Sequence, residues 1–158
     1  MAEKRIVEAR KGYFFEEFSS GQVVNTSART VTEADVVAFA ALTGDWNPIH
    51  SDAVYAAQQP FEQRLAHGML GTSFATGLAM RTGILDGTIL ALREIRGWKY
   101  SLPIYLGDTI QVKITIGETR PFPRMGGGLV TMHAELLNQR GEIVQHGDWV
   151  VLVKMQGS

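Results

Sequence analysis

The second half of the sequence contains a strict alternation of apolar and polar positions. Isoleucine and valine occupy every second place in the segment IQVKITI, residues 110–116, which is typical of an antiparallel strand with one buried face. Three other stretches, residues 88–100, 129–137 and 143–154, are also predicted as strands. The segment NQRG, residues 138–141, predicts the turn between the last two. We therefore expect a meander of three or four long strands.

A helix is predicted directly before Asp45. Residues 13–31 contain only short apolar alternations and predict a strand or an irregular entry. Thr32 then suits a helix N-cap, and Asp35, three residues later, can return the capping hydrogen bond. Gly44 suits the position just past the last turn. These signals predict a helix of about three turns.

A second helix is predicted over about His67–Arg81. The segment AHGMLGTSFATGLAM, residues 66–80, consists mainly of small and apolar residues, and a helix that is apolar all round is buried on most sides. Each interior glycine costs about 1 kcal/mol of helix propensity, so we expect neighbouring backbone to approach closely there. The pattern predicts an α+β fold, in which an antiparallel sheet curls around one central helix.

Composition and charge narrow the functional classes. The 158 residues are 45% hydrophobic and 20% charged, with a net charge of −1, so no bulk field favours nucleic acid or an anionic membrane. There is no cysteine, which excludes a thiol nucleophile and cysteine-bound metal. Residues 1–11 do not have the pattern of a signal peptide, and no apolar run is long enough to span a membrane. We expect one domain over residues 1–158, with a core at about 13–155, in the cytoplasm.

Asp45 and His50 form the first candidate for chemistry. They flank Pro48 on a predicted short loop whose entry is fixed by the preceding helix. A carboxylate can hold and deprotonate water, and an imidazole exchanges protons near neutrality. The alternative is that Asp45 is a turn residue and His50 a satisfied polar group, and spacing alone favours that alternative.

The segment His67-Gly68-Met69 forms the second candidate, because it stands where the central helix is expected to begin. The first N–H groups of a helix lack partners within the helix and carry the positive end of its dipole. The N–H of Gly68 could therefore stabilise a developing oxyanion. The alternative is that Gly68 only permits tight packing.

These residues together resemble a known family. The segment FAALTGDWNPIH, residues 39–50, followed by Ala56, resembles the signature of the (R)-specific enoyl-CoA hydratases among the MaoC-like dehydratases. The segment Ala66–Met69 is similar to the start of the central helix in that family. The motif covers about residues 31–80, and the order of the strands extends the resemblance to the remainder of the chain.

The resemblance implies a hotdog fold, and with it a homodimer or larger homo-oligomer with the acyl tunnel near the interface. It implies that water adds across the trans-2 double bond of an enoyl thioester, carried by CoA or acyl carrier protein, giving a (3R)-hydroxyacyl product. Asp45 would be the general base toward water, His50 would deliver the proton to the α carbon, and Gly68 would bind the enolate-like oxygen. No metal or cofactor is implied. Residues expected to contact the substrate are Asn47, His67, Met69 and Thr76.

Two alternatives remain at this stage. The hotdog fold also hosts acyl-CoA thioesterases, and fold alone does not decide chemistry. A non-catalytic module that binds acyl-CoA is the second alternative. His133 and His146 are expected to be structural or surface residues. The glycine-rich stretch Pro121–Gly128 is predicted as a flexible loop, whose triple glycine is only a weak phosphate-binding signal without a following helix.

Overall fold

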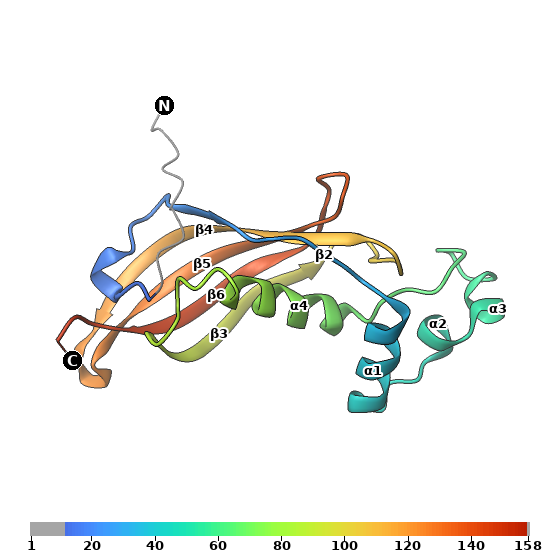
Figure 1. Ribbon diagram of the computed structural model, residues 1–158, viewed down its shortest axis with the longest axis horizontal. Coiled ribbons are helices and arrows are strands. Elements are labelled where there is room, and N and C mark those ends of the chain that lie inside the picture. Colours follow the sequence, from blue (N-terminus) through green and yellow to red (C-terminus); the bar gives the residue numbers. More distant parts are fainter. Residues whose placement is uncertain (1–11, 158) are drawn as a thin grey trace.

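An antiparallel sheet of six strands carries the fold, and one long helix lies along its face (Figure 1). The computed structural model describes residues 12–157. Five strands follow the order β1-β4-β5-β6-β3, and the short strand β2 also pairs with β4. The elements are η1 (Phe15–Glu17), β1 (Val23–Asn25), β2 (Arg29–Thr30), α1 (Glu33–Thr43), α2 (Pro48–Ser51), α3 (Ala53–Ala56), α4 (Gly68–Met80), β3 (Ile89–Tyr100), β4 (Thr109–Phe122), η2 (Pro123–Met125), β5 (Gly127–Leu137) and β6 (Ile143–Lys154).

The predicted meander is confirmed by β4, β5 and β6, which pair in sequence as antiparallel neighbours. The alternation in β4 works as expected, because its four apolar side chains between residues 110 and 116 are at most 1% exposed. β3 pairs with β6 instead of its chain neighbour β4, so β3 forms one edge of the sheet. The predicted turn at residues 138–141 joins β5 to β6.

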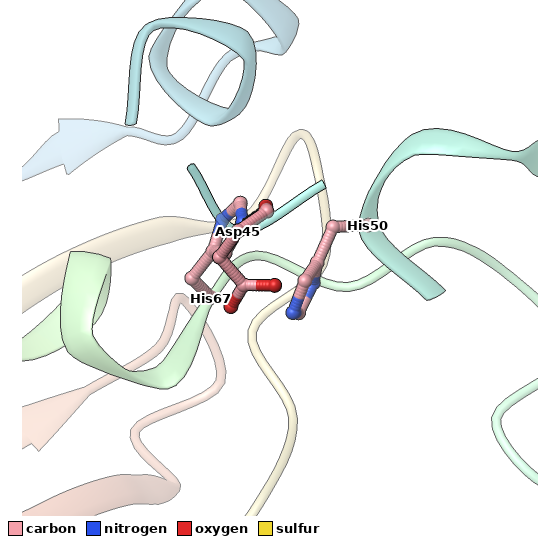
Figure 2. Close-up of side chains that lie close together, drawn as sticks. All are labelled: Asp45, His50 and His67. Carbon is pink, nitrogen blue, oxygen red and sulfur yellow. Dashed lines mark hydrogen bonds between the residues drawn. The ribbon is translucent and has the colours of Figure 1, made fainter. Parts of the chain in front are cut away.

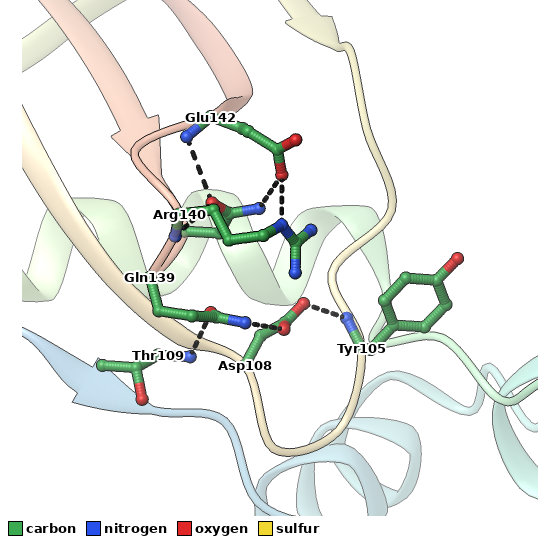
Figure 3. Close-up of polar contacts among 7 residues, drawn as sticks. Tyr105, Asp108, Thr109, Gln139, Arg140 and Glu142 are labelled. Carbon is green, nitrogen blue, oxygen red and sulfur yellow. Dashed lines mark hydrogen bonds and ion pairs between the residues drawn. The ribbon is translucent and has the colours of Figure 1, made fainter.

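That turn is tied to the start of β4 by a polar network (Figure 3). The side-chain oxygen of Gln139 accepts from Thr109 N at 3.0 Å, and its amide donates to Asp108 Oδ1 at 2.7 Å. The other oxygen of Asp108 accepts from Tyr105 N at 2.8 Å. Tyr105 also forms an isolated antiparallel bridge with Leu65. The network therefore fixes the backbone at Tyr105, which pairs with Leu65 in the segment before α4.

The predicted capping of α1 is confirmed. Thr32 Oγ1 accepts from Asp35 N at 3.3 Å, and the Asp35 carboxylate accepts from Thr32 N at 2.8 Å. Gly44 ends the helix in the left-handed region with φ 78°, where glycine has no steric penalty. Both ends of α1 are therefore set by local sequence.

The central helix is confirmed as α4, but its surroundings differ from the prediction. At Gly71 a side chain would meet the amide of Gln145 at 2.4 Å and Ile104 at 2.6 Å, so side chains and not backbone occupy that space. Gly77 has nothing within 4 Å of an added Cβ among the described residues. Met69 is 57% exposed. The prediction that this helix is buried on most sides is therefore wrong for the single chain, because the sheet covers only one face of the helix.

The glycine-rich stretch Pro121–Gly128 is not a flexible loop as predicted. β4 runs to Phe122, η2 makes the connection, and β5 begins at Gly127. A Cβ on Gly128 would lie 2.2 Å from the Phe15 ring, and one on Gly127 would lie 2.4 Å from the carbonyl oxygen of Val153. These glycines therefore serve close packing of η1 and β6 and give no support to a phosphate cradle.

In the described part of the chain, no helix has both the length and the apolar character to cross a membrane. The prediction about a signal peptide concerns residues 1–11, which lie outside the described residues. The predicted cytoplasmic location and the single domain over 1–158 stay predictions.

Replacing Gly128 by alanine tests the packing of η1. Because the new Cβ would overlap the Phe15 ring, we expect a loss of about 1–3 kcal/mol in the free energy of unfolding, the usual cost of overpacking. Urea unfolding of the wild type, Gly128→Ala, Phe15→Leu and the double variant measures it. The alanine should cost less when residue 15 is leucine; an equal cost in both backgrounds would rule out the overlap as the cause.

Candidate active site

Asp45 stands directly after the glycine that ends α1. Its carboxylate accepts from the backbone N–H of Asn47 at 3.2 Å, and its own N–H donates to Thr43 Oγ1 at 3.3 Å. The loop conformation is therefore fixed by short-range bonds, while the Asp45 side chain remains exposed in the single chain.

His50 lies on a short helix and not on a loop, so the predicted loop is wrong at its end. Pro48 occupies the first turn of α2, where its missing N–H carries no cost. Asn47 has the extended ψ of 136° expected before proline, and its side-chain oxygen accepts from Ile49 N at 3.2 Å. Asn47 is therefore the N-cap of α2, and this helical turn carries His50.

The backbone of Leu65 fixes the orientation of the His50 ring. His50 Nδ1 lies 2.8 Å from Leu65 O, and Leu65 N donates to Ile49 O at 3.1 Å. Because a carbonyl oxygen can only accept, Nδ1 carries the hydrogen and Nε2 keeps the free lone pair in neutral His50. This contact could not be predicted from the sequence, because its acceptor is a backbone carbonyl and not a side chain.

His67 contacts both Asp45 and His50. Its Nε2–H donates to the backbone oxygen of Asp45 at 2.8 Å, and its ring stacks on His50 with centroids 3.8 Å apart. The residue is 2% exposed, and its Nδ1 is buried with no hydrogen-bond partner among the described residues. His67 therefore supports the Asp45 backbone, and its predicted contact with substrate stays a prediction.

The helix that points at the site begins without a side-chain cap. α1, α2 and α3 each start with a side chain that accepts from the first turn, namely Thr32, Asn47 and Asp52. His67 precedes α4 and makes no such bond. Within the described chain the N–H of Gly68 has no acceptor. It is therefore available to a ligand, as the sequence predicted.

Tyr100, at the end of β3, is a site residue that the sequence did not reveal. A Cβ on Gly68 would lie 2.9 Å from the Tyr100 ring, so the alternative that Gly68 permits tight packing also holds. The Tyr100 hydroxyl donates to Met69 Sδ at 3.2 Å. A tyrosine in a half-exposed strand gives no sequence signal that it meets a helix start far away in the chain.

These groups surround one cavity of about 380 Å³. Figure 2 shows Asp45, His50 and His67 side by side, and one nitrogen or carboxylate oxygen from each lies within 4.8 Å of the others. One water that donates to two acceptors at about 2.8 Å spans separations of this size. The residues lining the cavity are Phe39, Thr43, Asp45, His50, His67, Gly68, Met69 and Tyr100.

Thr76 and Asn47 do not line this cavity. Thr76 Oγ1 donates to Ser73 O at 2.8 Å, and the residue borders a separate, apolar cavity of about 170 Å³ beside the second half of α4. Asn47 uses its side-chain oxygen on the α2 backbone, as described above. The structure therefore brings together five of the seven predicted site residues.

Comparison with known proteins identifies the family. Residues 17–135 match the family model described as the MaoC like domain. The chain belongs to the MaoC-like family. The (R)-specific enoyl-CoA hydratase of Aeromonas caviae is 33% identical to this MaoC-like chain over 121 residues, which are 75% of the chain and 83% of that protein. Protein MaoC of Klebsiella aerogenes is 39% identical over 113 residues, 72% of the chain, but the chain spans only 32% of that longer protein.

Solved structures confirm the hotdog fold of the MaoC-like chain. A monoamine oxidase regulatory protein from Archaeoglobus has a TM-score of 0.86 at 31% identity, with 95% of this chain and 99% of that one covered. A Mycobacterium tuberculosis protein described as a double hotdog fold has a TM-score of 0.81 at 19% identity, with 93% and 46% covered. The second likeness shows the fold alone.

The stacked histidines of this MaoC-like site argue against a shared metal ion. Imidazole binds a metal through the lone pair in its ring plane, at about 2.0–2.1 Å. The His50 and His67 planes are inclined by only 29° and are 3.8 Å apart at their centroids, so they do not meet within bonding distance of both nitrogens. In this conformation the pair suits proton exchange better than ligation.

The environment of His50 lowers its pKa from the ordinary value of 6.5. Burial is the largest cause, because it disfavours the charged ring, and nearby His67 acts in the same direction. The hydrogen bond to Leu65 and the charge of Asp45 oppose them in part. His50 in the MaoC-like site is therefore neutral at neutral pH, with Nε2 as a proton acceptor.

An NMR titration of the His50 ring should give a midpoint below pH 6.5, because the folded chain disfavours its protonation. Between the folded pKa and 6.5 the unfolded chain binds more protons, so stability should fall as the pH falls through this interval. Chemical denaturation of wild type and His50→Gln at several pH values isolates this part of the slope. A midpoint at or above 6.5, or equal slopes, would contradict the assignment.

Proposed function

We propose that this protein is an (R)-specific enoyl-thioester hydratase, which also catalyses the reverse dehydration of a (3R)-hydroxyacyl thioester. The observation that carries the proposal is the convergence of Asp45, His50 and the uncapped start of α4 at Gly68 on one cavity. Hydration needs these parts together: a site for water, a proton carrier and a donor for the carbonyl oxygen.

The Gly68 N–H suits the thioester carbonyl. When water adds to the β carbon, negative charge moves to the carbonyl oxygen, and a preorganised N–H stabilises that charge more than the uncharged carbonyl. The positive end of the α4 dipole adds to this effect. Removal of one such donor typically costs about 10²–10³-fold in rate.

The tautomer of His50 suggests a proton route that differs from the predicted division of roles. Neutral His50 has no proton on Nε2 to give at the start, since its hydrogen is on Nδ1 facing Leu65. We propose that Nε2 takes a proton from the water as its oxygen bonds to the β carbon, and then gives that proton to the α carbon. Asp45 holds the water through its other hydrogen and stabilises the transient imidazolium. Water is consumed whole, and both groups return to their initial states.

The substrate is proposed to be an acyl-CoA or the equivalent carrier-protein thioester. H and OH delivered from one water add to the same face of the double bond, and the face on which Asp45 and His50 hold the water sets the configuration at the β carbon. The apolar cavity that Thr76 borders is lined by aliphatic and aromatic side chains and suits part of an acyl chain, so Thr76 remains a proposed contact with substrate.

The functional unit is proposed to be a homodimer or larger homo-oligomer. β3 is an edge strand, and an open edge with apolar side chains is a ready site for pairing with another chain. On the neighbouring helix, Met69 and Met80 are also exposed. Apolar side chains of β3 that are 42–52% exposed are Leu90, Leu92, Ile95 and Tyr100.

The activity is tested with crotonyl-CoA by following the absorbance of the conjugated thioester, with a thiol reagent present to detect free CoA. Asp45→Asn and His50→Ala are each expected to lower the rate by at least about 10²-fold, because the first removes the charge that holds the water and stabilises the imidazolium and the second removes the proton carrier. Matched controls are Asp148→Asn and His133→Ala, since these residues form another aspartate–histidine pair at 2.6 Å on the sheet. The controls should retain wild-type rates.

Each outcome of that assay is informative. Loss of absorbance without free CoA, abolished by the site variants only, supports hydration. Release of CoA favours the thioesterase alternative. Tight binding of acyl-CoA with no turnover of short, long or carrier-bound enoyl thioesters favours a binding module.

Replacing Ile95 by lysine tests the oligomer. A charge on the exposed edge strand should oppose pairing of two β3 strands, so we expect a shift from dimer toward monomer in light scattering coupled to size exclusion. Ile143→Lys is the matched control, because Ile143 is 37% exposed on β6 and is not on the edge strand. A wild-type monomer, or an equal effect of both variants, would rule out the β3 interface.

A further inference from the structure

A buried amide side chain lies behind the first turn of α4 and has no part in the proposed chemistry. Gln145 of β6 is 2% exposed. Its Nε2 donates to Gly68 O at 2.9 Å. Its Oε1 accepts from Thr72 Oγ1 at 3.1 Å and from Trp98 Nε1 at 3.2 Å. The sheet therefore reaches the helix start through one satisfied polar side chain.

Burying the Gln145 amide destabilises the fold unless its polar atoms make hydrogen bonds. A buried amide without partners is strongly destabilised relative to water, and an apolar side chain would fill the same space without that cost. The helix is also adapted to the amide, since a side chain on Gly71 would lie 2.4 Å from Gln145 Nε2. A specific contact with Gly68 is therefore built into both elements.

Tyr100, which pairs with Gln145 across β3 and β6, also contacts Gly68. Its ring lies against the Gly68 Cα, where a Cβ would be 2.9 Å away, and its hydroxyl lies 3.4 Å from Thr72 Oγ1. Gly68 is thus held at its carbonyl by Gln145 and at its Cα by Tyr100. The peptide whose carbonyl Gln145 binds also carries the N–H of Met69, so this bond fixes the rotation of the first turn.

We propose that Gln145 is a positioning residue for the oxyanion-binding turn, acting through the carbonyl of Gly68. The inference rests on the proposed function. The bond holds the carbonyl of the residue whose N–H is the proposed donor, and so fixes how that residue is oriented. An error of about 1 Å in such a site costs about 10²-fold in rate. The Gln145 bond therefore contributes to kcat, with little effect on binding of the ground-state substrate.

Gln145→Glu is the deciding variant, because it keeps the shape of the side chain. The ionised carboxylate accepts from Thr72 and Trp98 but cannot donate to Gly68 O. We expect kcat for crotonyl-CoA to fall about 10- to 10²-fold, with KM changed less than threefold. Burial raises the pKa of a carboxyl group, and the protonated acid can donate again. The ratio of variant to wild-type kcat should therefore rise as the pH falls.

Two controls separate this role from a loss of folding. Trp98→Phe removes a donor to Gln145 Oε1 but leaves the Gly68 bond, so its kcat should stay within threefold of wild type. Circular dichroism at each pH gives the folded fraction, by which kcat is normalised. The backbone amide signals of Gly68 and Met69, followed by NMR, should show a pH-dependent shift in Gln145→Glu that is additional to the shift that His50 causes in wild type.

The two proposals fail in different ways. If wild type hydrates crotonyl-CoA and Asp45→Asn does not, but Gln145→Glu keeps wild-type kcat at pH values where NMR shows the introduced carboxyl to be ionised, the role of Gln145 is wrong and the function stands. If wild type does not hydrate any enoyl thioester, the function is wrong, and unchanged Gly68 and Met69 signals in Gln145→Glu would also overturn the positioning role. A uniform loss of kcat that follows the folded fraction would make Gln145 a structural residue only.

Discussion

The site depends on how the short segment before α4 is tied to the segment after α1. His50 Nδ1 donates to Leu65 O, and His67 Nε2 donates to the backbone oxygen of Asp45. On the opposite side, Ala66 N donates to Ile104 O at 2.8 Å. These bonds bring together segments that are distant in sequence, and so place the side chains of Asp45 and His50 beside the start of α4. Without them the acid, the imidazole and the free N–H would have no common cavity.

Much of this architecture could be predicted because its signals are local. Thr32 and Asp35 cap α1 by contacts within one turn, and Gly44 ends it, so the placement of Asp45 followed from neighbouring residues. The alternation in β4 records which face is buried, because successive side chains of a strand point to opposite faces. The motif from Phe39 to His50 concentrated the chemistry on one short stretch, and the resemblance then supplied the fold.

What could not be predicted is contact between distant elements. Tyr100 and Gln145 are ordinary strand residues in sequence, and only the pairing of β3 with β6 beside α4 brings them to Gly68. The carbonyl of Leu65 has no side-chain signature at all. The sequence shows glycine at positions 71 and 128, but it does not show that a side chain from another element occupies the space that a larger residue would need at each position. Local patterns therefore identified the candidate reacting groups and missed the groups that orient them.

The start of α4 explains why such orienting groups are needed. A capped helix start is more stable by about 1 kcal/mol, but a side-chain cap would occupy the N–H groups of the proposed oxyanion site. The helix therefore begins uncapped at Gly68, a residue with low helix propensity, and local sequence does not stabilise this turn. Stability has to come from tertiary contacts that leave the N–H free. A bond to the Gly68 carbonyl, which Gln145 makes, meets that condition, because it holds the turn through an acceptor and leaves the N–H free.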